Sequence, residues 1–300
     1  MLIGVDWGTT NLRAHLIGAD GGIEETVRSD AGLMKVPAGG FETTLATTIA
    51  PLRDKAPDAP VIMSGMVGAR GGWVEAPYVP TPANLDAIAD KTLTIDAPTV
   101  GTVWLVPGVA VGIDGAEWAD VMRGEETEIL GALDAMGGMD GTYVLPGTHA
   151  KWISVKAGAI TGFRTFMTGD LFSAIHNHTI LSRSKDDTLD PAAFEDGLEM
   201  ARGLTAPGDL LTRLFTIRAE GLMGRCPQNA TLGTLSGLLV GAEVLASARE
   251  ADEVIIVGAS PLAMDYTRAC NFFGVHPRVL REEMAPRGQA LIAARRGAMR

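Results

Sequence analysis

An aspartate at the end of an apolar run, followed directly by a small turn rich in hydroxyl groups, is the feature of this chain best suited to chemistry. Residues 2–5 are apolar, Asp6 follows them, and Gly8, Thr9 and Thr10 lie in the turn. A carboxylate can hold a hydrated Mg²⁺, while backbone N–H groups and hydroxyls can meet phosphate oxygens at close range. The segment therefore indicates phosphate binding with Asp6 at the metal, although an ordinary hairpin with a capping aspartate gives the same short pattern.

The same pattern occurs again near the middle of the chain. Residues 143–155 again predict a strand, a turn that contains Gly147, Thr148 and His149, and a second strand. Two such hairpins predict two similar halves that face one another across a cleft and grip nucleotide phosphates from both sides. A chance similarity between two β-hairpins is the alternative.

The residues around these turns predict the strands and helices that must hold them in place. Apolar runs and alternation predict strands at 2–6, 11–16, 23–27, 61–68, 100–106, 143–145, 150–156, 160–167 and 253–257. Helical spacing predicts helices at 41–55, 122–135, 171–181, 193–204, 210–221 and 232–245, with Pro286 in the first turn of a last helix. The proline-rich stretch at residues 77–82 is expected to be a surface loop.

Length and composition are those of a globular protein. With 300 residues, 46% hydrophobic and 20% charged, the chain is long enough for two lobes, expected at 1–106 and 107–300. The net charge of −11 argues against a nucleic-acid partner, which would require clustered Lys and Arg. Cys226 and Cys270 favour a reducing compartment and cannot assemble a zinc site. No apolar run is long enough for a bilayer and no leader is evident, so a cytoplasmic protein without a membrane partner is expected.

Three longer motifs carry a resemblance to a known family. They are VDWGTTNLR at 5–13, DVMRGEET at 120–127 and LPGTHAKW at 145–152. The first resembles the motif shared by sugar kinases, actin and heat-shock ATPases, and the other two together resemble the 2-dehydro-3-deoxygalactonokinase family. The resemblance covers essentially the whole chain. It implies an α/β protein with the two-lobed, actin-like ATPase (ribonuclease H-like) fold and a nucleotide cleft between the lobes.

The resemblance also implies an activity. Members of that family are expected to use MgATP to phosphorylate the terminal 6-hydroxyl of 2-dehydro-3-deoxy-D-galactonate, in the breakdown of D-galactonate. Asp6 would hold Mg²⁺ and the two Gly-Thr turns would surround the β- and γ-phosphates, with ATP and a small sugar acid as partners. Gly258 and Ala259, in the turn after a buried strand, match the place where superfamily members pass close to adenosine.

The general base is less determined than the phosphate turns. Related carbohydrate kinases use an Asp beside a Gly at the start of a helix shortly before the second hairpin, and Gly124-Glu125 matches that place. Glu125 is the nearest match, although a glutamate is one methylene longer, and Asp120 is the competing candidate. Asp170 and a mechanism without a single base stay open, because a base must reach the hydroxyl proton before its pKa matters.

A sugar acid also requires a cation for its carboxylate, and arginine suits this role because it can bind a carboxylate bidentately. Arg70, in the loop after the strand at 61–68, and Arg123, beside the expected base, are the best placed. Weaker candidates on or near the hairpins are Arg13, Lys151 and Arg164. Trp73, next to two glycines, could pack against the sugar, although a lone tryptophan is more often part of a core.

Two other functions fit the same sequence. One keeps the kinase and changes the substrate to another sugar or sugar acid, such as the gluconate epimer. The other is a sugar-sensing regulator or an actin-like assembly protein on the same fold. The negative charge and the lack of room for a DNA-reading helix-turn-helix before the first strand disfavour the regulator. The sequence leaves a homodimer open.

Overall fold

The computed structural model describes residues 1–113, 115, 118–183, 191–206, 208–248, 251–258 and 260–297. The chain forms two compact units. The first unit consists of Met1–Asp140, Ile153–Phe163 and Glu282–Arg300, and the second of Gly141–Trp152 and Arg164–Arg281.

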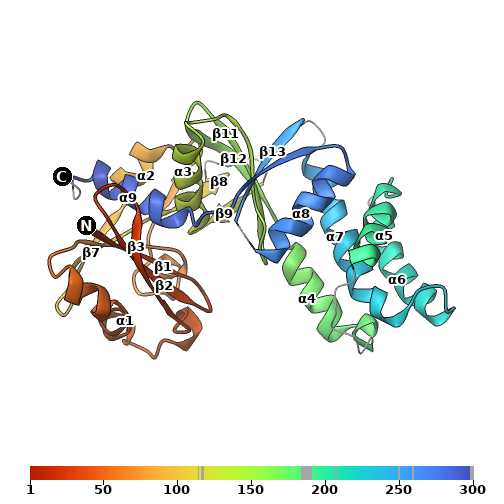
Figure 1. The fold of residues 1–300 in the computed structure, drawn as a ribbon, viewed down its shortest axis with the longest axis horizontal. Helices are drawn as coiled ribbons and strands as arrows, with labels where there is room; N and C mark the ends of the chain where they lie inside the picture. The colour runs from red at the N-terminus through yellow and green to blue at the C-terminus, as the bar shows by residue number, and fades with distance from the viewer. Residues whose placement is uncertain are drawn as a thin grey trace. The chain divides into compact units, whose positions relative to one another are not determined.

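A six-stranded sheet forms the centre of the first unit (Figure 1). Its order is β3-β2-β1-β4-β7-β6, with β1 Leu2–Trp7, β2 Leu12–Ile17, β3 Ile23–Ser29, β4 Val61–Ser64, β6 Leu93–Ala97 and β7 Gly101–Leu105. The first three strands are joined as antiparallel hairpins, whereas β4 runs parallel to β1 and β7 runs parallel to β4. This arrangement agrees with the strands predicted at the start of the chain. The strand predicted at 61–68 is confirmed only in its first half, because β4 ends at Ser64 and Met66–Gly68 form a 3₁₀ helix.

A small sheet and several α-helices complete the first unit. The helices are α1 Phe41–Lys55, α2 Leu85–Lys91, α3 Glu125–Ala135 and α9 Ala285–Arg295, and the sheet β5-β8-β9 contains β5 Tyr78–Pro80, β8 Gly108–Val111 and β9 Asp120–Met122. The surface loop predicted at residues 77–82 is therefore wrong in part, because residues 78–80 pair with β8, and an edge strand tolerates Pro80. The helix predicted from residue 122 begins at Glu125, because residues 120–122 also pair with β8.

The two faces of β1 contact different helices, because successive side chains of a strand point to opposite sides. Ile3 and Trp7 are fully buried in a core cluster that includes residues of α1. Gly4, on the other face, lies against the side chain of Gln289 in α9. Asp6 shares the face of Gly4, so the alternation directs its carboxylate to the side of the sheet that α9 covers.

The second unit is built on a sheet of the order β12-β11-β10-β13-β14. Its strands are β10 Gly141–Leu145, β11 Ala150–Lys156, β12 Ala159–Phe166, β13 Glu253–Val257 and β14 His276–Leu280, although residues 153–163 pack with the first unit. Its α-helices are α4 Thr168–His178, α5 Pro191–Arg202, α6 Asp209–Leu222, α7 Thr231–Ser247 and α8 Pro261–Phe272. The strand order matches β3-β2-β1-β4-β7 of the first unit, and β13 is parallel to both β10 and β14. The fold therefore contains the duplication that the two Gly-Thr hairpins predict.

The compact units differ from the division that the sequence predicts at residue 106. Residues 107–140 belong to the first unit, because β8 pairs with β5 and α3 packs against α9. A functional division into 1–106 and 107–300 stays a prediction.

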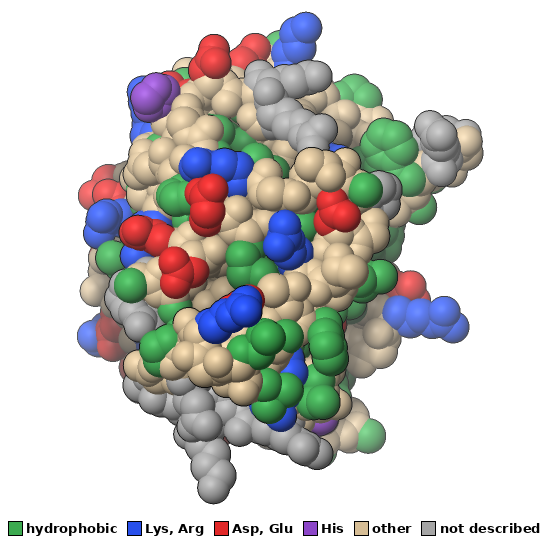
Figure 2. All heavy atoms as spheres, turned by 90° about the vertical axis from the view of Figure 1, so that its right-hand side faces the viewer, with side chains coloured by type: hydrophobic (Ala, Val, Ile, Leu, Met, Phe, Trp, Pro, Cys, Tyr) green, Lys and Arg blue, Asp and Glu red, His purple; other side chains and the backbone are tan. Residues whose placement is uncertain are grey.

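Helix α6 leaves apolar side chains exposed. Leu211, Phe215 and Leu222 are each more than half exposed. Figure 2 views the side of the second unit that carries α5 and α6, and hydrophobic side chains gather in one part of this face. Among the described residues, no helix has the length and apolar character needed to cross a membrane.

Candidate active site

Asp6 lies near the end of β1, where the strand register places it beside Arg13 of β2 and Ser64 of β4. Burial raises the pKa of Asp6 above its usual value. The positive charge of Arg13 lowers this pKa, and the negative charge of Glu283 raises it. The carboxylate is therefore short of positive charge, which a bound cation would supply.

Two glycines connect the end of β1 to the start of α3. Gly65 follows β4, and a Cβ atom on it would lie 3.2 Å from Oδ1 of Asp6 and 2.8 Å from the carbonyl oxygen of Trp7. Gly124 precedes α3, and a Cβ atom on it would lie 3.2 Å from Cα of Gly65. Both glycines have positive φ angles, +96° and +111°, which other residues rarely adopt. These contacts bring Asp6 and the segment of Glu125 together within the first unit.

The start of α3 is acidic, and its carboxylates bind the backbone around them. Oε2 of Glu125 accepts a hydrogen bond from the N–H of Arg123 at 2.9 Å. Oε2 of Glu126 accepts from the N–H of Gly124 at 2.7 Å, and its Oε1 accepts from the hydroxyl of Thr127 at 2.8 Å. The positive end of the helix dipole favours carboxylates here. Glu125 is only half-buried, so its carboxylate is oriented without being sealed from solvent.

Negative charge accumulates around these glutamates. Burial raises the pKa of Glu126 to about 7, and the charge of Glu125 adds to the rise. Burial also raises the pKa of Glu128 to about 8, with further increases from the charges of Asp6, Glu125 and Glu126. The first unit therefore has an excess of carboxylates around Asp6 that a divalent cation would neutralise.

The donor set fits Mg²⁺ better than a metal held by protein alone. Within the described residues, no group of three or more His, Cys, Asp and Glu side chains is arranged to hold a metal ion. Mg²⁺ keeps several waters and commonly binds through one or two carboxylates together with substrate phosphates. One carboxylate at the end of a strand suits a Mg²⁺ ion that arrives with a nucleotide.

Asp120, the competing candidate for the base, lies at the beginning of β9. Its Oδ1 accepts a hydrogen bond from the N–H of Val121 at 2.8 Å. Asp120 pairs with Val111 of β8 and precedes Gly124 by four residues, whereas Glu125 directly follows Gly124. This geometry favours Glu125 over Asp120 as the carboxylate near Asp6.

Arg123 is almost completely buried, with 7% of its surface exposed. Its Nη2 donates to the carbonyl oxygen of Ala76 at 2.8 Å, and its guanidinium carbon lies 4.4 Å from the centroid of the Tyr78 ring. Within the described residues, its Nε and Nη1 have no hydrogen-bond partner. Unsatisfied buried donors on a charged group are costly, so Arg123 retains the capacity to bind an anion.

The other predicted sugar-binding residues are placed differently. Arg70 is exposed in the loop after β4. The ring of Trp73 stacks on that of Phe41 with centroids 6.4 Å apart, and Phe41 meets Trp7 edge-on at 5.8 Å. Trp73 therefore packs at the margin of the core, and its contact with a sugar stays a prediction.

The three weaker cation candidates all have protein partners. Nη1 of Arg13 lies 3.6 Å from Oε1 of Glu283. Nζ of Lys151, which is buried, donates to the hydroxyl of Thr165 at 2.7 Å. Nη2 of Arg164 donates to the carbonyl oxygen of Ala246 at 2.8 Å. These contacts favour structural roles for all three.

The first Gly-Thr turn exposes its two threonines, whereas the N–H of Gly8 donates to the carbonyl oxygen of Asn11 at 2.9 Å. The carbonyl oxygens of Gly8 and Thr9 accept hydrogen bonds from the N–H groups of Leu33 and Met34 at 3.0 and 3.2 Å. Thr9 and Thr10 are exposed, and within the described chain their own N–H groups have no hydrogen-bond partner. Free amides beside hydroxyls are suited to phosphate oxygens.

The second Gly-Thr turn lies against the start of α4. The N–H of Asp170 donates to the carbonyl oxygen of Thr148 at 3.1 Å, and a Cβ atom on Gly169 would lie 2.8 Å from Cα of Thr148. Thr148 and His149 are exposed, and Nε2 of His149 lies 3.6 Å from Oδ2 of Asp170. A helix N-terminus beside the turn adds partial positive charge where phosphate binding is predicted. Asp170 pairs with His149 here, which disfavours it as the base.

Glu243, a buried carboxylate of the second unit, was not among the site residues predicted from the sequence. Glu243 of α7 accepts hydrogen bonds from Nε1 of Trp152 at 2.6 Å, from the hydroxyl of Tyr266 at 2.7 Å and from the hydroxyl of Thr168. Thr168 is the first residue of α4, so the network ties that helix to β11, α7 and α8. The signal was present in the sequence, because Glu243 is the single charged residue among residues 231–247.

The predicted adenosine turn borders a pocket. Gly258 has a φ angle of +127°, and its N–H donates to the carbonyl oxygen of Leu280 at 2.9 Å. The pocket has a volume of about 160 Å³ and is lined by Gly258, Ser260, Ala263, Met264, Thr267, Arg268, Val279 and Arg281. Ala259, the other residue predicted there, lies outside the described residues.

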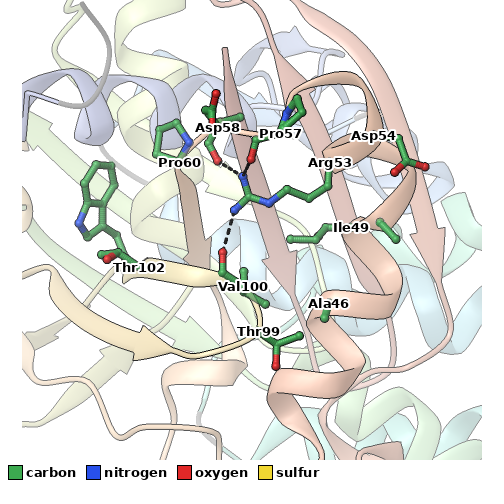
Figure 3. Close-up of a pocket in the computed structure, with 13 residues that line it drawn as sticks. Ala46, Ile49, Arg53, Asp54, Pro57, Asp58, Pro60, Thr99, Val100 and Thr102 are labelled. Carbon is green, nitrogen blue, oxygen red and sulfur yellow. Dashed lines mark hydrogen bonds between the residues drawn. The ribbon is translucent and has the colours of Figure 1, made fainter.

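A second, larger pocket of about 670 Å³ lies in the first unit, between α1 and residues 99–104 (Figure 3). None of the predicted site residues lines it. Its Arg53 donates to the carbonyl oxygens of Pro57, Ala59 and Val100, so the guanidinium holds loops together. The contacts of Arg53 indicate a structural role for this side chain.

The duplicated strand order, with a Gly-Thr hairpin in each unit, is that of an α/β protein with the two-lobed, actin-like ATPase fold of sugar kinases. Comparisons with known proteins agree. The sequence model of the 2-keto-3-deoxy-galactonokinase family matches residues 6–292. The chain therefore belongs to the 2-keto-3-deoxy-galactonokinase family, a family of carbohydrate kinases.

Individual relatives cover nearly all of the chain. A probable 2-dehydro-3-deoxygalactonokinase of Rhizobium meliloti is 37% identical and covers 97% of this chain and 95% of its own. The 2-dehydro-3-deoxygalactonokinase of Escherichia coli is 36% identical, and the match covers 91% of this chain and 90% of the relative. A crystal structure of a protein from Sinorhizobium meliloti assigned to the same family has a TM-score of 0.88, with 36% identity and 98% coverage of both chains.

Proposed function

We propose that this protein transfers the γ-phosphoryl group of ATP to the 6-hydroxyl of 2-dehydro-3-deoxy-D-galactonate, in the breakdown of D-galactonate. Family membership and the names of the two relatives support this substrate. The observation that carries the proposal is the series of contacts from Asp6 through Gly65 and Gly124 to Glu125. These contacts show that the two segments are neighbours, and they support the assignment of the metal to Asp6 and of the proton to Glu125.

Asp6 would hold Mg²⁺, which when bound neutralises charge on the phosphates of ATP. The amides and hydroxyls of Thr9 and Thr10 would donate to phosphate oxygens. In the second unit, Gly147, Thr148 and His149 would do the same with the N-terminus of α4 behind them. Protein groups in phosphoryl transfer act mainly by positioning and charge stabilisation, and these two turns supply both.

Glu125 would accept the proton of the 6-hydroxyl. As the hydroxyl oxygen forms its bond to the γ-phosphorus, the bond from phosphorus to the bridging oxygen of ADP breaks, and the proton passes to the carboxylate. The hydrogen bond from the N–H of Arg123 orients this carboxylate. Asp120 would take no direct part.

Arg123 would bind the carboxylate of the sugar acid through its unsatisfied Nε and Nη1. Both atoms are shielded from solvent, and Nη1 would lie 3.1 Å from a Cβ atom on Gly68. The proposal therefore includes a local movement of the loop around Gly68 that admits the carboxylate. Arg70, exposed on the same loop, would supply a second positive charge, and Trp73 would border the sugar.

Adenosine would bind at Gly258 and Ala259, beside the pocket that Ser260, Thr267 and Arg281 line. The positive φ angle of Gly258 supports this placement, because it turns the chain sharply after β13 without a side chain in the way. We place the reaction in the cytoplasm, where ATP is supplied, with ATP and the sugar acid as partners.

A coupled assay of ADP release tests the proposal. Purified protein with MgATP is incubated with 2-dehydro-3-deoxygalactonate, its gluconate epimer, galactose, glycerol or no acceptor. The proposal predicts turnover with 2-dehydro-3-deoxygalactonate at a kcat/KM at least about tenfold above that of the epimer. Equal or greater turnover with the epimer would reassign the substrate, and ADP release without an acceptor would favour an assembly or regulatory ATPase.

A further inference from the structure

A glutamine of the last helix lies fully buried beneath the strand that ends in Asp6. Gln289 of α9 has no exposed surface. Its Nε2 donates to the carbonyl oxygen of Val5 and to the hydroxyl oxygen of Ser64, each at 2.9 Å. Because a carbonyl oxygen can only accept, the atom beside Val5 must be the amide nitrogen, which fixes the orientation of this side chain.

The two acceptors belong to the two segments that form the site around Asp6. The carbonyl of Val5 is part of the peptide unit whose nitrogen is that of Asp6. Ser64 directly precedes Gly65, which lies against the Asp6 carboxylate and against Gly124. One side-chain amide therefore binds the backbone of β1 and the end of β4 at the residues next to the site.

The surrounding packing leaves Gln289 little freedom. A Cβ atom on Gly4 would lie 2.2 Å from its Oε1, so the amide occupies the space that a side chain at residue 4 would need. Within the described residues, Oε1 has no hydrogen-bond partner. A buried amide that keeps one atom unsatisfied is expensive compared with an apolar side chain, which points to a role for its two donated bonds.

Helix α9 also fixes the helix that begins at Glu125. A Cβ atom on Gly288 would lie 1.9 Å from the carbonyl oxygen of Thr127, and one on Gly131 would lie 2.1 Å from the carbonyl oxygen of Met284. The backbones of α3 and α9 are therefore in direct contact. Gln289 extends from α9 toward β1 and β4, so a single helix contacts all three segments that carry the site.

We infer that Gln289 is a positioning residue that holds the backbone of Asp6 and Gly65 in the geometry needed for the metal and for phosphoryl transfer. It touches neither substrate nor metal, and it acts through Val5 and Ser64. This inference rests on the proposed function of Asp6. A misplacement of about 1 Å can lower turnover by about 100-fold, so the loss of both bonds is expected to affect catalysis as well as stability.

The test is Gln289→Met, which keeps the length of the side chain and removes both donors. The expected result is a rise of about tenfold in the Mg²⁺ concentration for half-maximal activity and a fall of about 10- to 100-fold in kcat. The affinity for metal-free ADP and the KM for the sugar acid should stay within about twofold. Binding of Mn²⁺ to the protein with ADP, measured by electron paramagnetic resonance, should weaken in parallel and gives a readout that is independent of turnover.

The matched control is Ile292→Val, which shortens another fully buried side chain of α9. It should lower the melting temperature and leave the Mg²⁺ requirement unchanged. If Gln289→Met lowers only the melting temperature, in the manner of Ile292→Val, the positioning role is wrong. Should Gln289→Met fail to fold, Ser64→Ala removes one of the two bonds, and an unchanged Mn²⁺ affinity in that variant would overturn the inference.

The same measurements separate this inference from the proposed function. If Asp6→Asn binds Mn²⁺ and ADP as the unchanged protein does, the role of Asp6 fails and the inference fails with it. If Asp6→Asn loses Mn²⁺ binding and Gln289→Met retains it, the inference alone is contradicted.

Discussion

Gly124 lies directly against Gly65, so that a Cβ atom on Gly124 would be 3.2 Å from Cα of Gly65. Gly65 in turn lies against the carboxylate of Asp6, and Gly124 is followed by Glu125. The distance between the two carboxylate-bearing segments therefore depends on the absence of side chains at two positions.

The variant Gly124→Ala should disturb both the backbone and this contact. A non-glycine residue at a φ angle of +111° is strained by about 1–3 kcal/mol, and its methyl group would push α3 away from Gly65. Thermal unfolding and the ADP-release assay should show lower stability and lower kcat. Gly39→Ala is the control, because Gly39 also has a positive φ angle, +74°, but has open space around it. Equal kcat values for the two variants would contradict the importance of the contact.

The assignment of the base predicts different outcomes for three carboxylates. Glu125→Gln should lower kcat by about 10²- to 10⁴-fold, because a general base contributes a factor of this size. Asp120→Asn and Asp170→Asn should retain most of the turnover. Steady-state kinetics with saturating MgATP distinguish them, and a loss confined to Asp120→Asn would transfer the role to Asp120.

Replacement of Arg123 should lower the kcat/KM for the sugar acid without changing the KM for ATP. Arg123→Lys keeps the charge but loses the planar donor group and its contact with Tyr78. The kcat/KM for the sugar acid is expected to fall by about 10- to 100-fold, with an unchanged KM for ATP. A comparable rise in the KM for ATP, together with a lower melting temperature, would indicate a structural role instead.

Two glutamates of α3, Glu126, which is buried, and Glu128, which is half-buried, predict a stability that falls as the pH rises. An unfolded glutamate titrates near 4.5, whereas burial raises the pKa of Glu126 to about 7 and of Glu128 to about 8. Between these limits the folded chain binds more protons than the unfolded chain. The contribution of these two groups to the free energy of unfolding is therefore fully present below pH 4.5. It is lost as the pH rises through the folded-state pKa values of about 7 and 8.

The measurement is the melting temperature of the protein without ligands between about pH 5 and pH 9. One unit of pKa shift corresponds to about 1.4 kcal/mol, so the slope should be readily visible. Glu128→Gln removes one titrating group and should flatten the profile, with its largest stabilisation at the alkaline end. An identical slope in the variant would show that Glu128 titrates normally in the folded protein.

Much of the fold could be predicted from local patterns. The helix expected at residues 41–55 has those same bounds, since its apolar spacing is regular and a proline follows. The two hairpins were predictable because alternating strands flank turns rich in Gly and Thr. Short strands such as β5 and β9 were not, since three residues give no period and their pairing with β8 is set by distant parts of the chain.

The site shows the same contrast. Asp6 and the Gly-Thr turns could be proposed as site residues from the sequence, because the chemistry that suggests them is local in the chain. Gln289 and Glu243 could not be assigned roles, because their partners are distant in the chain. Val5 lies 284 residues from Gln289, and Trp152 lies 91 residues from Glu243. The sequence also does not indicate that Arg123 is buried. Its guanidinium contacts the ring of Tyr78 and the carbonyl oxygen of Ala76, which belong to a separate strand and loop.

The most direct test of the central claim is the ³¹P NMR spectrum of the product formed from MgATP and 2-dehydro-3-deoxygalactonate. Phosphorylation of the 6-hydroxyl predicts a phosphomonoester signal split into a triplet by the two hydrogens on C6, in proportion to the ADP released. A doublet would place the phosphate on a secondary hydroxyl. Inorganic phosphate as the only new signal would contradict the account, because the protein would then be an ATPase and not a sugar-acid kinase.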